Sequence, residues 1–500
     1  MQADTTSVIV VGGGTAGCMT AALLAKILGA RVHVTLVESE AIGIVGVGEA
    51  TIPPICAVNA MLGIDEGAFL RATVATIKLG IRFDGWGRPG DSYDHSFGGA
   101  GRDLPFCGFH HFCTRAAMEG LPANYWDHDF NALCIEAGRF APDAETAPNP
   151  VWSLPHAYHF DAGLYGHFLR GIAEGLGVRR IEGRVVDVSR APETGDVTAL
   201  HLEDGRSLEG ALFIDCSGSR GLLIEQFLQT GYEDWSHWLP CDRALAVPSA
   251  REAVSPLYTR ATARAAGWQW RIPLQHRNGN GLVYSSAYLD DDAAADTLMA
   301  GLTTAAQDSP RLLRFRTGRA RRQWHHNVVA IGLSSGFLEP LESTSIYLIQ
   351  SAIVRLLHLF PHGGNPDAQR AEYNRQSAIE YERVRDFVIL HYHAQRRPEP
   401  FWVERRATAL PDRLAEKIAL FAGTGTIVQD PFDIFTEASW VKVLLGQGIT
   451  PAAYHPLAGG FSRDALARQF EQMATVKRQG VARLPLHDAW LSATMARTAA

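Results

Sequence analysis

The first forty residues contain two short apolar runs, separated by a glycine-rich turn and a longer apolar stretch. Residues 7–11 form the first run, and residues 32–38 form the second run, which ends at Glu38. The stretch between the turn and the second run is rich in alanine and leucine, which favours a helix. The pattern therefore predicts a strand, a turn, a helix and a second strand over residues 8–38.

The same reasoning predicts further elements along the chain. Alternating apolar positions indicate strands, and longer stretches with helical spacing indicate helices. Residues 91–145 mix aromatic, glycine and polar residues with little periodicity, which indicates the wall of a pocket. From Asp367 onward the pattern is mainly helical, with prolines as breaks. Helices are predicted over 62–75, 164–176 and 346–360, and strands over 77–83, 178–181, 184–188, 197–202, 208–215, 267–273 and 327–332.

Three local signals refine this picture. The Glu-Asp-Gly-Arg sequence at 203–206 predicts a hairpin turn between two of the strands. Trp268 and Trp270 fall on one face of their predicted strand, because side chains alternate along a strand. Ser343 or Thr344 is a natural N-cap for the helix that follows.

The glycine turn has the spacing of a dinucleotide-binding unit, Gly12-x-Gly14-x-x-Gly17. Gly12 suits the tight turn, Gly14 lets the backbone approach a pyrophosphate, and Gly17 lets the helix pack close to the strand. The free N–H groups at the helix start, around Thr15 and Ala16, favour the pyrophosphate charge. A unit of this kind at the N-terminus favours FAD over a nicotinamide cofactor.

Two further features fit a flavin nucleotide. Glu38 ends the second strand, where its carboxylate can accept hydrogen bonds from both ribose hydroxyls and would repel a 2′-phosphate. Residues 43–54, which include Ala50, combine glycines that permit close backbone approach with two prolines that exclude a regular helix. We therefore expect this loop to lie against a flat group.

Composition excludes several classes of protein. The chain has 500 residues, of which 46% are hydrophobic and 20% charged, so we expect a globular protein with a large core or more than one core. The formal net charge of -7 argues against a nucleic-acid-binding surface. No apolar run approaches the roughly 20 residues that a membrane span needs.

Seven scattered cysteines do not form a disulfide framework, which indicates a reducing compartment. The N-terminus lacks the basic region of a signal peptide, so we expect a cytoplasmic protein. The group Cys107, His110, His111 and Cys113 matches no zinc spacing, and we expect no metal site.

With these stretches laid out, the chain resembles the flavin-dependent tryptophan halogenase family up to about Leu445. Besides the glycine turn, the resemblance rests on the sequence 46–53, the strand that carries Lys78, the sequence 267–273 and the sequence 339–344. The pair Trp268 and Trp270, together with Lys78, is the feature that separates halogenases from related monooxygenases.

The resemblance implies a two-site mechanism. Reduced FAD from a separate flavin reductase, oxygen and chloride or bromide give hypohalous acid, which passes through the protein to Lys78. The halide would lie at Thr344 and Ser345, where a helix start favours an anion, although a capped helix alone fits the same residues. Without the resemblance, a lysine in a strand is usually a solvated surface charge.

The resemblance also assigns roles around the substrate. Lys78 would hydrogen-bond hypohalous acid or become a haloamine, and Glu342 would accept the proton of the cationic arene intermediate. Ser343 would help to orient the reacting group. The remaining matched positions are Trp268 and Trp270, which would separate flavin from substrate, and His95 and Phe97, which would stack on an indole ring.

One region departs from the family. Members that act on free tryptophan carry a tyrosine pair in the region of residues 438–442, and this pair is absent here. We therefore expect an indole or another electron-rich arene that lacks the amino-acid end, or a larger substrate in an open site.

The expected fold class is α/β, with a flavin-monooxygenase-like FAD-binding Rossmann-type domain, a β-rich substrate subdomain and a mainly helical C-terminal part. We expect the FAD-binding and halogenase core over residues 1–366 and a helical region that covers the substrate site over residues 367–500. A homodimer is a further expectation. Two rival functions are an FAD-dependent aromatic hydroxylase, against which the two tryptophans argue, and a flavin-binding protein without turnover.

Overall fold

The computed structural model describes residues 5–42, 48–142, 152–362 and 365–497. The chain forms two compact units, each built from three separate stretches of sequence. Unit 1 comprises residues 1–75, 160–242 and 313–382, and unit 2 comprises residues 76–159, 243–312 and 383–500. The expected boundary between residues 366 and 367 stays a prediction about the division of function.

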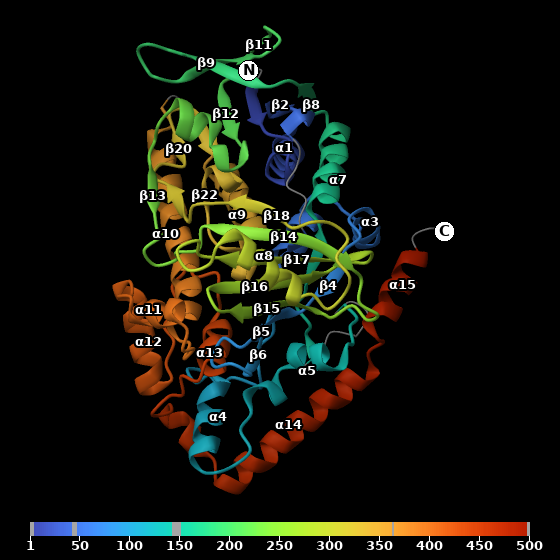
Figure 1. The fold of residues 1–500 in the computed structure, drawn as a ribbon, viewed down its shortest axis with the longest axis vertical. Helices are drawn as coiled ribbons and strands as arrows, with labels where there is room; N and C mark the ends of the chain where they lie inside the picture. The colour runs from blue at the N-terminus through green and yellow to red at the C-terminus, as the bar shows by residue number, and fades with distance from the viewer. Residues whose placement is uncertain (1–4, 43–47, 143–151, 363–364, 498–500) are drawn as a thin grey trace. The chain divides into compact units, whose positions relative to one another are not determined.

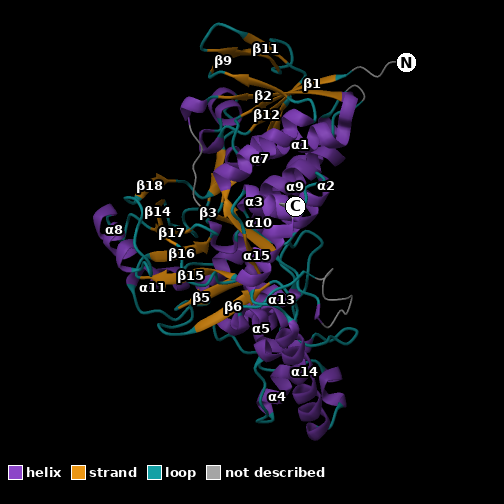
Figure 2. Cartoon of the chain, turned by 90° about the vertical axis from the view of Figure 1, so that its right-hand side faces the viewer, coloured by secondary structure: helices purple, strands orange, loops and turns teal. Residues whose placement is uncertain are grey.

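A six-stranded sheet forms the centre of unit 1, in the order β20-β21-β12-β1-β2-β8 (Figure 1). Strands β21 to β8 run parallel, and β20 pairs antiparallel with β21. A parallel sheet is covered on both faces, which explains the continuous apolar run of β1. On one face, helices α1 and α7 lie side by side (Figure 2). The elements named here are β1 (Thr6–Val11), α1 (Thr15–Leu28), β2 (Val32–Glu38), α7 (Ala162–Gly175), β8 (Arg179–Glu182), β12 (Leu212–Asp215), β20 (Trp324–His325) and β21 (Val328–Ala330).

Smaller elements complete unit 1. Two three-stranded antiparallel sheets have the orders β11-β10-β9 and β13-β19-β22. The strands of these sheets are β9 (Val185–Arg190), β10 (Val197–Leu202), β11 (Ser207–Glu209), β13 (Tyr232–Asp234), β19 (Gly318–Ala320) and β22 (Gly336–Phe337), and the short strand β3 (Gly48–Ala50) belongs to neither sheet. The helices and helical turns are η1 (Gly29–Arg31), η2 (Glu40–Ile42), α2 (Pro54–Met61), α3 (Glu66–Ala72), η5 (Gly218–Arg220), η6 (Leu222–Phe227), η7 (Gly332–Ser334), η8 (Pro340–Glu342), α9 (Ser345–His358) and the first part of α10 (Asp367–His393).

A seven-stranded sheet forms the centre of unit 2, in the order β18-β14-β17-β16-β15-β5-β6. Figure 1 shows the strands from β14 to β6 stacked in this order. Helix α8 packs on β14 and β17, where its Leu298 joins Leu245, Val247 and Leu282 in a buried cluster. The strands of unit 2 are β4 (Thr76–Lys78), β5 (Gly80–Asp84), β6 (Ser92–Ser96), β7 (Ala157–Asp161), β14 (Arg243–Ala250), β15 (Tyr258–Arg264), β16 (Gly267–Pro273), β17 (Arg277–Tyr284) and β18 (Arg311–Arg314). Its helices and helical turns are α4 (Phe109–Met118), η3 (Tyr125–His128), α5 (Phe130–Ala137), α8 (Asp291–Ala300), α11 (Pro400–Ala407), α12 (Asp412–Thr424), α13 (Glu437–Gly446), η9 (Pro456–Gly460), α14 (Arg463–Arg483) and α15 (His487–Arg497), with the last part of α10.

Much of the predicted secondary structure is confirmed. The strand-turn-helix-strand unit forms β1, α1 and β2, the hairpin forms β10 and β11, and the tryptophan strand forms β16. The C-terminal part is mainly helical, and the chain has the expected α/β architecture. Residues 43–47, which belong to the glycine-rich loop, lie outside the described residues.

The helix predicted over residues 62–75 is shorter in the structure, where α3 covers only part of this range. A separate helix, α2, ends before the range begins, and the chain turns between α2 and α3 at Gly63, whose φ is 75°. Asp65 then starts α3 by accepting a hydrogen bond from the Ala68 backbone nitrogen at 2.8 Å. Pro54 starts α2, because proline is tolerated in the first helical turn.

The strand predicted over residues 77–83 is divided in the structure into two strands, which belong to two different sheets. Strand β4 pairs with β7, whereas β5 pairs with β15 and β6. Leu79 lies between them and donates its backbone N–H to the Leu257 carbonyl at 2.7 Å. A Cβ on Gly80 would lie 2.6 Å from the His95 carbonyl oxygen, so β5 can approach β6 only with glycine at this position. The apolar pattern runs through the break because both strands are buried.

Two other predictions need correction. Residues 91–145 contain β6, α4, η3 and α5, which their weak periodicity did not indicate. Residues 109–116 of α4 are all buried although they include His110, His111, Thr114 and Arg115, so polarity along this stretch does not indicate which positions are buried. The strand predicted over 208–215 is divided at Gly210 into β11, which pairs with β10, and β12, which pairs with β1.

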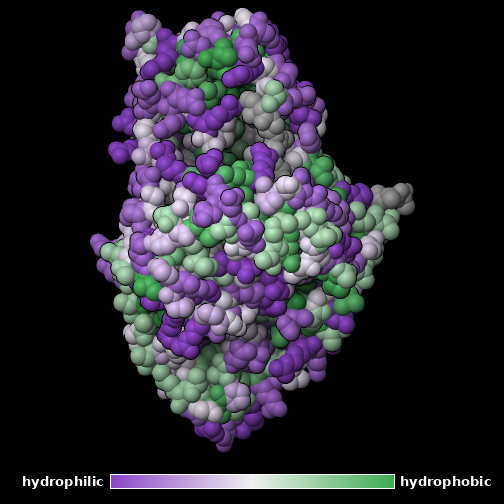
Figure 3. Space-filling model, viewed as in Figure 1, coloured by the Kyte–Doolittle hydropathy of each residue, from purple (hydrophilic) through white to green (hydrophobic). Residues whose placement is uncertain are grey.

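Large apolar side chains at the surface are scattered along the chain. Phe106, Val254 and Val428 are the most exposed of those in the described residues. The face drawn in Figure 3 shows hydrophobic residues interspersed with hydrophilic ones. Among the described helices, none is both long enough and apolar enough to cross a membrane.

Candidate functional site

The glycine turn of unit 1 has the geometry of a nucleotide-binding turn. Gly12 has a φ of 117°, and a Cβ there would lie 2.2 Å from the Cys216 carbonyl oxygen. A Cβ on Gly17 would lie 1.8 Å from the Gly12 carbonyl oxygen, so only glycine lets α1 pack this close to the turn. Around Gly14, by contrast, no protein atom lies within 4 Å of an added Cβ, and no side chain caps α1. The turn therefore leaves room for a pyrophosphate at the start of α1.

Glu38 lies against this turn and is held by two arginines. A Cβ on Gly13 would lie 1.5 Å from Glu38 Oε2. Arg170 Nη1 donates to Glu38 Oε1 at 3.1 Å, and Arg180 Nε donates to the same oxygen. The hydrogen bond to Glu38 raises the pKa of the Arg180 guanidinium. One carboxylate oxygen is thus fixed by cations, and the other faces the turn where a ribose would lie.

Gly332 joins the nucleotide turn to the helix expected to bind halide. A Cβ on Gly332 would lie 2.9 Å from Ala16 Cβ and 3.6 Å from Ile349 Cγ1. Ile349 belongs to the first part of α9, which follows Thr344 directly. The starts of α1 and α9 are therefore packed around one glycine within unit 1. Thr15 donates its hydroxyl to the Ala162 carbonyl at 3.2 Å.

The segment before α9 is buried and strained. Glu342 ends η8 and is 1% exposed. Ser343 has a φ of 59° and a ψ of 36°, a left-handed conformation that is uncommon for residues other than glycine. Backbone strain of this kind clusters at functional sites.

The N-cap prediction for this helix is confirmed in position and wrong in chemistry. Thr344 occupies the N-cap of α9, but its side chain makes no capping hydrogen bond. Its φ of -89° and ψ of -9° are close to helical, whereas a capping residue is normally extended. Ser345 is the first residue of the helix. The N–H groups of the first turn of α9 are therefore not capped by Thr344.

A second carboxyl group lies beside Ala50. Ala50 is buried at the end of β3. The preceding residue is Glu49, and burial raises the pKa of its carboxyl group to about 7. The sequence reasoning did not single out Glu49.

In unit 2, Lys78 is fully buried at the end of β4. Its Nζ lies 5.3 Å from the centre of the Phe97 ring. The nearby His159 is also buried, and burial together with the Lys78 charge holds the pKa of His159 well below its usual value. Thr76 contacts His159 Nδ1 at 3.2 Å, and Thr259 contacts His159 Nε2 at 2.9 Å. Lys78 therefore lies in a buried interior beside a hydrogen-bonded histidine and is not a surface residue.

His95 lies near the end of β6, next to an aromatic stack, and Phe97 follows directly after this strand. The Phe387 and Phe435 rings are stacked with centroids 3.8 Å apart. The His95 ring lies 5.7 Å from Phe387 and 6.3 Å from Phe435. Trp440 packs edge-on against Phe387 at 4.8 Å. This arrangement supplies flat, apolar surfaces of the kind that an arene would contact.

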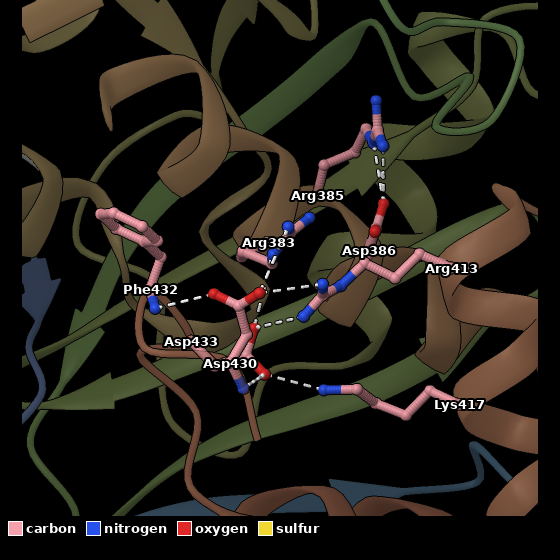
Figure 4. A network of polar contacts seen from close by, with 8 residues as sticks. All are labelled: Arg383, Arg385, Asp386, Arg413, Lys417, Asp430, Phe432 and Asp433. Atoms are coloured by element: carbon pink, nitrogen blue, oxygen red, sulfur yellow. Dashed lines mark hydrogen bonds and ion pairs between the residues drawn. The ribbon is translucent and has the colours of Figure 1, made fainter. Parts of the chain in front are cut away.

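Two aspartates hold the loop that carries Phe435. Figure 4 shows Asp430 and Asp433 among three cationic side chains from α10 and α12. Lys417 Nζ lies 2.8 Å from Asp433 Oδ2, and Arg413 Nη1 lies 3.0 Å from Asp430 Oδ2. Arg383 lies within 3.7 Å of both carboxylates. The loop is therefore anchored to two helices, one of which carries Phe387.

Trp268 and Trp270 are buried on β16, with ring centroids 6.1 Å apart. A Cβ on Gly281 would lie 2.1 Å from the Trp270 indole, so this glycine on β17 makes room for the ring. Trp268 also contacts Trp86 at 6.5 Å. The two tryptophans form a rigid part of the sheet, as core residues would, and this packing is compatible with a wall between two sites.

The structure thus groups the expected residues within each unit. Unit 1 carries the nucleotide turn, Glu38, Ala50 and residues 342–345. Unit 2 carries Lys78, His95, Phe97 and the two tryptophans. For the group Cys107, His110, His111 and Cys113 we expect no metal site. One of these side chains, His110, bonds through Nε2 to the Gly425 carbonyl at 2.7 Å.

Sequence reasoning missed several residues that support these groups. Arg170 and Arg180 come from elements far from Glu38 in sequence, and nothing in their local pattern marks them. Lys442 is different, because it interrupts an apolar stretch of α13 and is 0% exposed. A lysine within such a stretch is a signal for a buried partner.

Comparison with known proteins identifies the family. The model of the tryptophan halogenase family matches residues 7–463. A tryptophan 6-halogenase from Streptomyces toxytricini is 37% identical over 482 residues, which cover 88% of this chain and 89% of that protein. A tryptophan 7-halogenase from Lentzea aerocolonigenes is 35% identical over 495 residues, which cover 91% and 92% of the two chains.

Solved structures agree with this result. A flavin-dependent halogenase from Xanthomonas campestris is 47% identical with a TM-score of 0.95, and the match covers 98% of both chains. A flavin-dependent halogenase from Brevundimonas sp. BAL3 is 44% identical with a TM-score of 0.94, and the match covers 99% of this chain and 100% of the other. The fold, the nucleotide turn and both comparisons lead to one conclusion: the chain belongs to the tryptophan halogenase family and is a flavin-dependent halogenase.

Proposed function

We propose that this halogenase installs chlorine or bromine on an indole or another electron-rich arene, and not on free tryptophan. The observation that carries the proposal is the buried Lys78, whose Nζ lies over the ring of Phe97, two residues after His95, which contacts the stack of Phe387 and Phe435. A dry cation beside flat apolar surfaces can present an electrophilic halogen to an arene.

The glycine turn, with Gly12, Gly14 and Gly17, and the start of α1 at Thr15 and Ala16 would hold the FAD pyrophosphate. Glu38 would accept hydrogen bonds from the ribose, and Ala50 would lie against the flavin. When bound in its reduced form, FAD activates oxygen so that a halide is oxidised to hypohalous acid. A separate flavin reductase supplies the reduced flavin.

The halide would lie at the start of α9, at the backbone of Thr344 and Ser345, because the dipole and the N–H groups there favour an anion. Trp268 and Trp270 would keep the substrate away from the flavin. This separation would favour halogenation over direct oxygen transfer to the arene.

Lys78 would hold the electrophile by donating a hydrogen bond to hypohalous acid or by forming a haloamine. Glu342 would accept the proton that the halogenated ring loses, and its carboxylate would stabilise the positive charge on the ring. Ser343 would orient the reacting group. His95 and Phe97 would stack on the arene.

The proposal about free tryptophan rests on helix α13. The positions where members that act on free tryptophan carry a tyrosine pair hold Ala438, Ser439, Trp440 and Lys442 here. Trp440 packs against Phe387, and Lys442 makes buried polar contacts within unit 2. These side chains are engaged inside the protein and would not clamp an amino-acid end.

Three further expectations, about the cellular compartment, the division of function along the chain and the oligomeric state, remain as proposals. No disulfide joins the seven cysteines, all of which lie within the described residues, and this supports a reducing compartment such as the cytoplasm. We further propose that residues 1–366 carry the chemistry and that residues 367–500 cover the substrate. A homodimer is the third proposal, which analytical ultracentrifugation would check.

Mass spectrometry tests the function directly. The reaction contains the protein, FAD, NADH, a flavin reductase and bromide, with indole and tryptophan as parallel substrates. A bromine isotope doublet on indole with little on tryptophan is the expected result. Equal bromination of tryptophan would contradict the substrate proposal, and a hydroxylated product without bromine would contradict the reaction.

A further inference from the structure

We propose that Lys442 is a positioning residue that fixes the backbone around Phe97 and thereby sets how the arene meets Lys78. The inference rests on the proposed function, since it concerns the substrate side of the same site. Lys442 acts through Phe97 and contacts neither substrate nor cofactor in this scheme.

Lys442 is a fully buried cation with a complete set of partners. Lys442 and Asp129 are each 0% exposed, and Lys442 Nζ lies 2.6 Å from Asp129 Oδ2. Lys442 Nζ also donates to the carbonyl and hydroxyl oxygens of Ser96, each at 2.8 Å, and to the carbonyl oxygen of Gly98. The Ser96 hydroxyl in turn donates to Asp129 Oδ2 at 2.7 Å.

These contacts hold the chain on both sides of Phe97. The carbonyl groups of Ser96 and Gly98 flank this residue, and both accept from the same ammonium. The Phe97 backbone nitrogen donates to the Leu79 carbonyl at 2.9 Å. Leu79 directly follows Lys78, so the backbone contact and the ring contact join Phe97 to the same short segment.

The neighbours of Gly98 make this loop rigid. A Cβ on Gly98 would lie 2.4 Å from Asn131 Oδ1. Asn131 Nδ2 donates to the carbonyls of Pro155 at 2.7 Å and Leu79 at 3.4 Å. Helix α5, which carries Asn131, is capped by Asp129 through the Ala132 backbone nitrogen at 3.0 Å. The loop that presents Phe97 is therefore clamped between α5 and α13.

A buried ion pair is a poor device for stability, because burial of both charges offsets most of their attraction. Apolar side chains of similar size would fill the same space at no such cost. What the ion pair provides here is direction: one ammonium with three N–H donors holds two particular carbonyls. Helix α13 also carries Trp440, which contacts the aromatic stack through Phe387. One helix thus positions both the Phe97 loop and the stack beside His95.

The main test is the double variant Lys442→Met with Asp129→Asn, which removes both charges so that neither is left buried alone. The probe is indole with bromide, FAD, NADH and a flavin reductase. The first readout is the ratio of bromoindole isomers. The second is the share of oxidised bromide that brominates indole when a soluble diketone is added to trap electrophilic bromine in solution. We expect at least a threefold fall in that share and a broader mixture of isomers, with flavin binding unchanged.

Lys477→Met is the matched control. Lys477 is a buried lysine on α14 that interacts electrostatically with Asp129, and within the described residues no hydrogen bond joins it to Ser96 or Gly98. We expect this variant to keep the wild-type isomer ratio. An equal effect of Lys477→Met would overturn the proposal, because loss of any buried lysine would then suffice.

Ser96→Ala gives an independent test that leaves the ion pair intact. It removes only the hydroxyl contacts, and we expect a smaller change in the same direction. If the double variant folds and keeps the wild-type isomer ratio and bromide share, the role of Lys442 is overturned. If the double variant does not fold, the same result in a folded Ser96→Ala variant overturns it. Failure of the wild-type protein to brominate any arene would instead overturn the proposed function.

Discussion

The Nζ atom of Lys78 lies 5.3 Å from the centre of the Phe97 ring, inside unit 2. An ammonium at this distance from an aromatic face is attracted by the ring quadrupole, and more strongly where water is excluded. The contact joins the residue expected to carry the electrophile to a residue expected to stack on the substrate. It also gives Lys78 a defined place in an interior where a lysine is otherwise costly.

Replacement of Lys78 with Ala should abolish halogenation and leave FAD binding intact. The ammonium is the group expected to hold the electrophilic halogen, and the glycine turn that would bind FAD lies in the other unit. Bromide incorporation by mass spectrometry and FAD binding by fluorescence titration measure the two properties. Retained bromination would show that Lys78 is not required.

Replacement of Glu342 with Gln should slow halogenation at least about a hundredfold, the usual size of a general-base effect. Glutamine keeps the volume of this buried side chain but cannot accept the proton. Single-turnover rates with indole measure the chemical step. A loss smaller than about a hundredfold would leave Glu342 only a supporting role.

Gly14→Ala should affect FAD binding, whereas Gly17→Ala should affect the stability of the fold. An added Cβ meets no protein atom at position 14 but lies 1.8 Å from a carbonyl oxygen at position 17. Gly14→Ala should therefore keep the melting temperature and weaken FAD binding about tenfold or more, because the Cβ fills the space left for pyrophosphate. Gly17→Ala should lower the melting temperature by several degrees. Equal FAD affinity in Gly14→Ala and the wild type would argue against this binding site.

Arg180→Gln should weaken FAD binding by about threefold to tenfold, because Glu38 loses a charged hydrogen bond that orients its carboxylate. The melting temperature should change little, since Arg180 is partly exposed and such ion pairs contribute little to stability. Arg184→Gln, which changes a more exposed arginine, is the control. Fluorescence titration with FAD separates the two variants, and equal affinities would exclude a role for Arg180.

Buried histidines should make the protein less stable as the pH falls. Burial lowers the pKa of His111 and of His128 from 6.5 to about 4, so the folded state resists their protonation. Their neutral forms are fully compatible with folding above pH 6.5, and stability is lost as the pH falls from 6.5 towards 4. Each contributes about 1–2 kcal/mol of destabilisation at pH 5.

The variant His111→Gln should therefore lose less melting temperature between pH 7 and pH 5 than the wild type. Replacement of the exposed His33 with Gln is the control and should leave the difference unchanged. Differential scanning calorimetry at pH 7 and pH 5 measures this difference in melting temperature. An unchanged difference in His111→Gln would exclude this residue as a source of acid sensitivity.

The sequence alone determined the parts of this protein whose geometry is local. The spacing of Gly12, Gly14 and Gly17 dictates a tight turn in which the protein itself requires glycine at positions 12 and 17, and the apolar runs on either side define β1 and β2. Motifs of this kind carry their own structural requirement, so they could be interpreted without the rest of the chain.

Only the tertiary structure decided which distant residues meet. The break at Leu79 between two sheets was invisible because both strands are buried, and α4 was missed because it buries polar as well as apolar side chains. The clamp of Lys442 on Ser96 spans 346 positions of sequence. Burial and long-range hydrogen bonds of this kind depend on packing between elements, which no local pattern of side chains records.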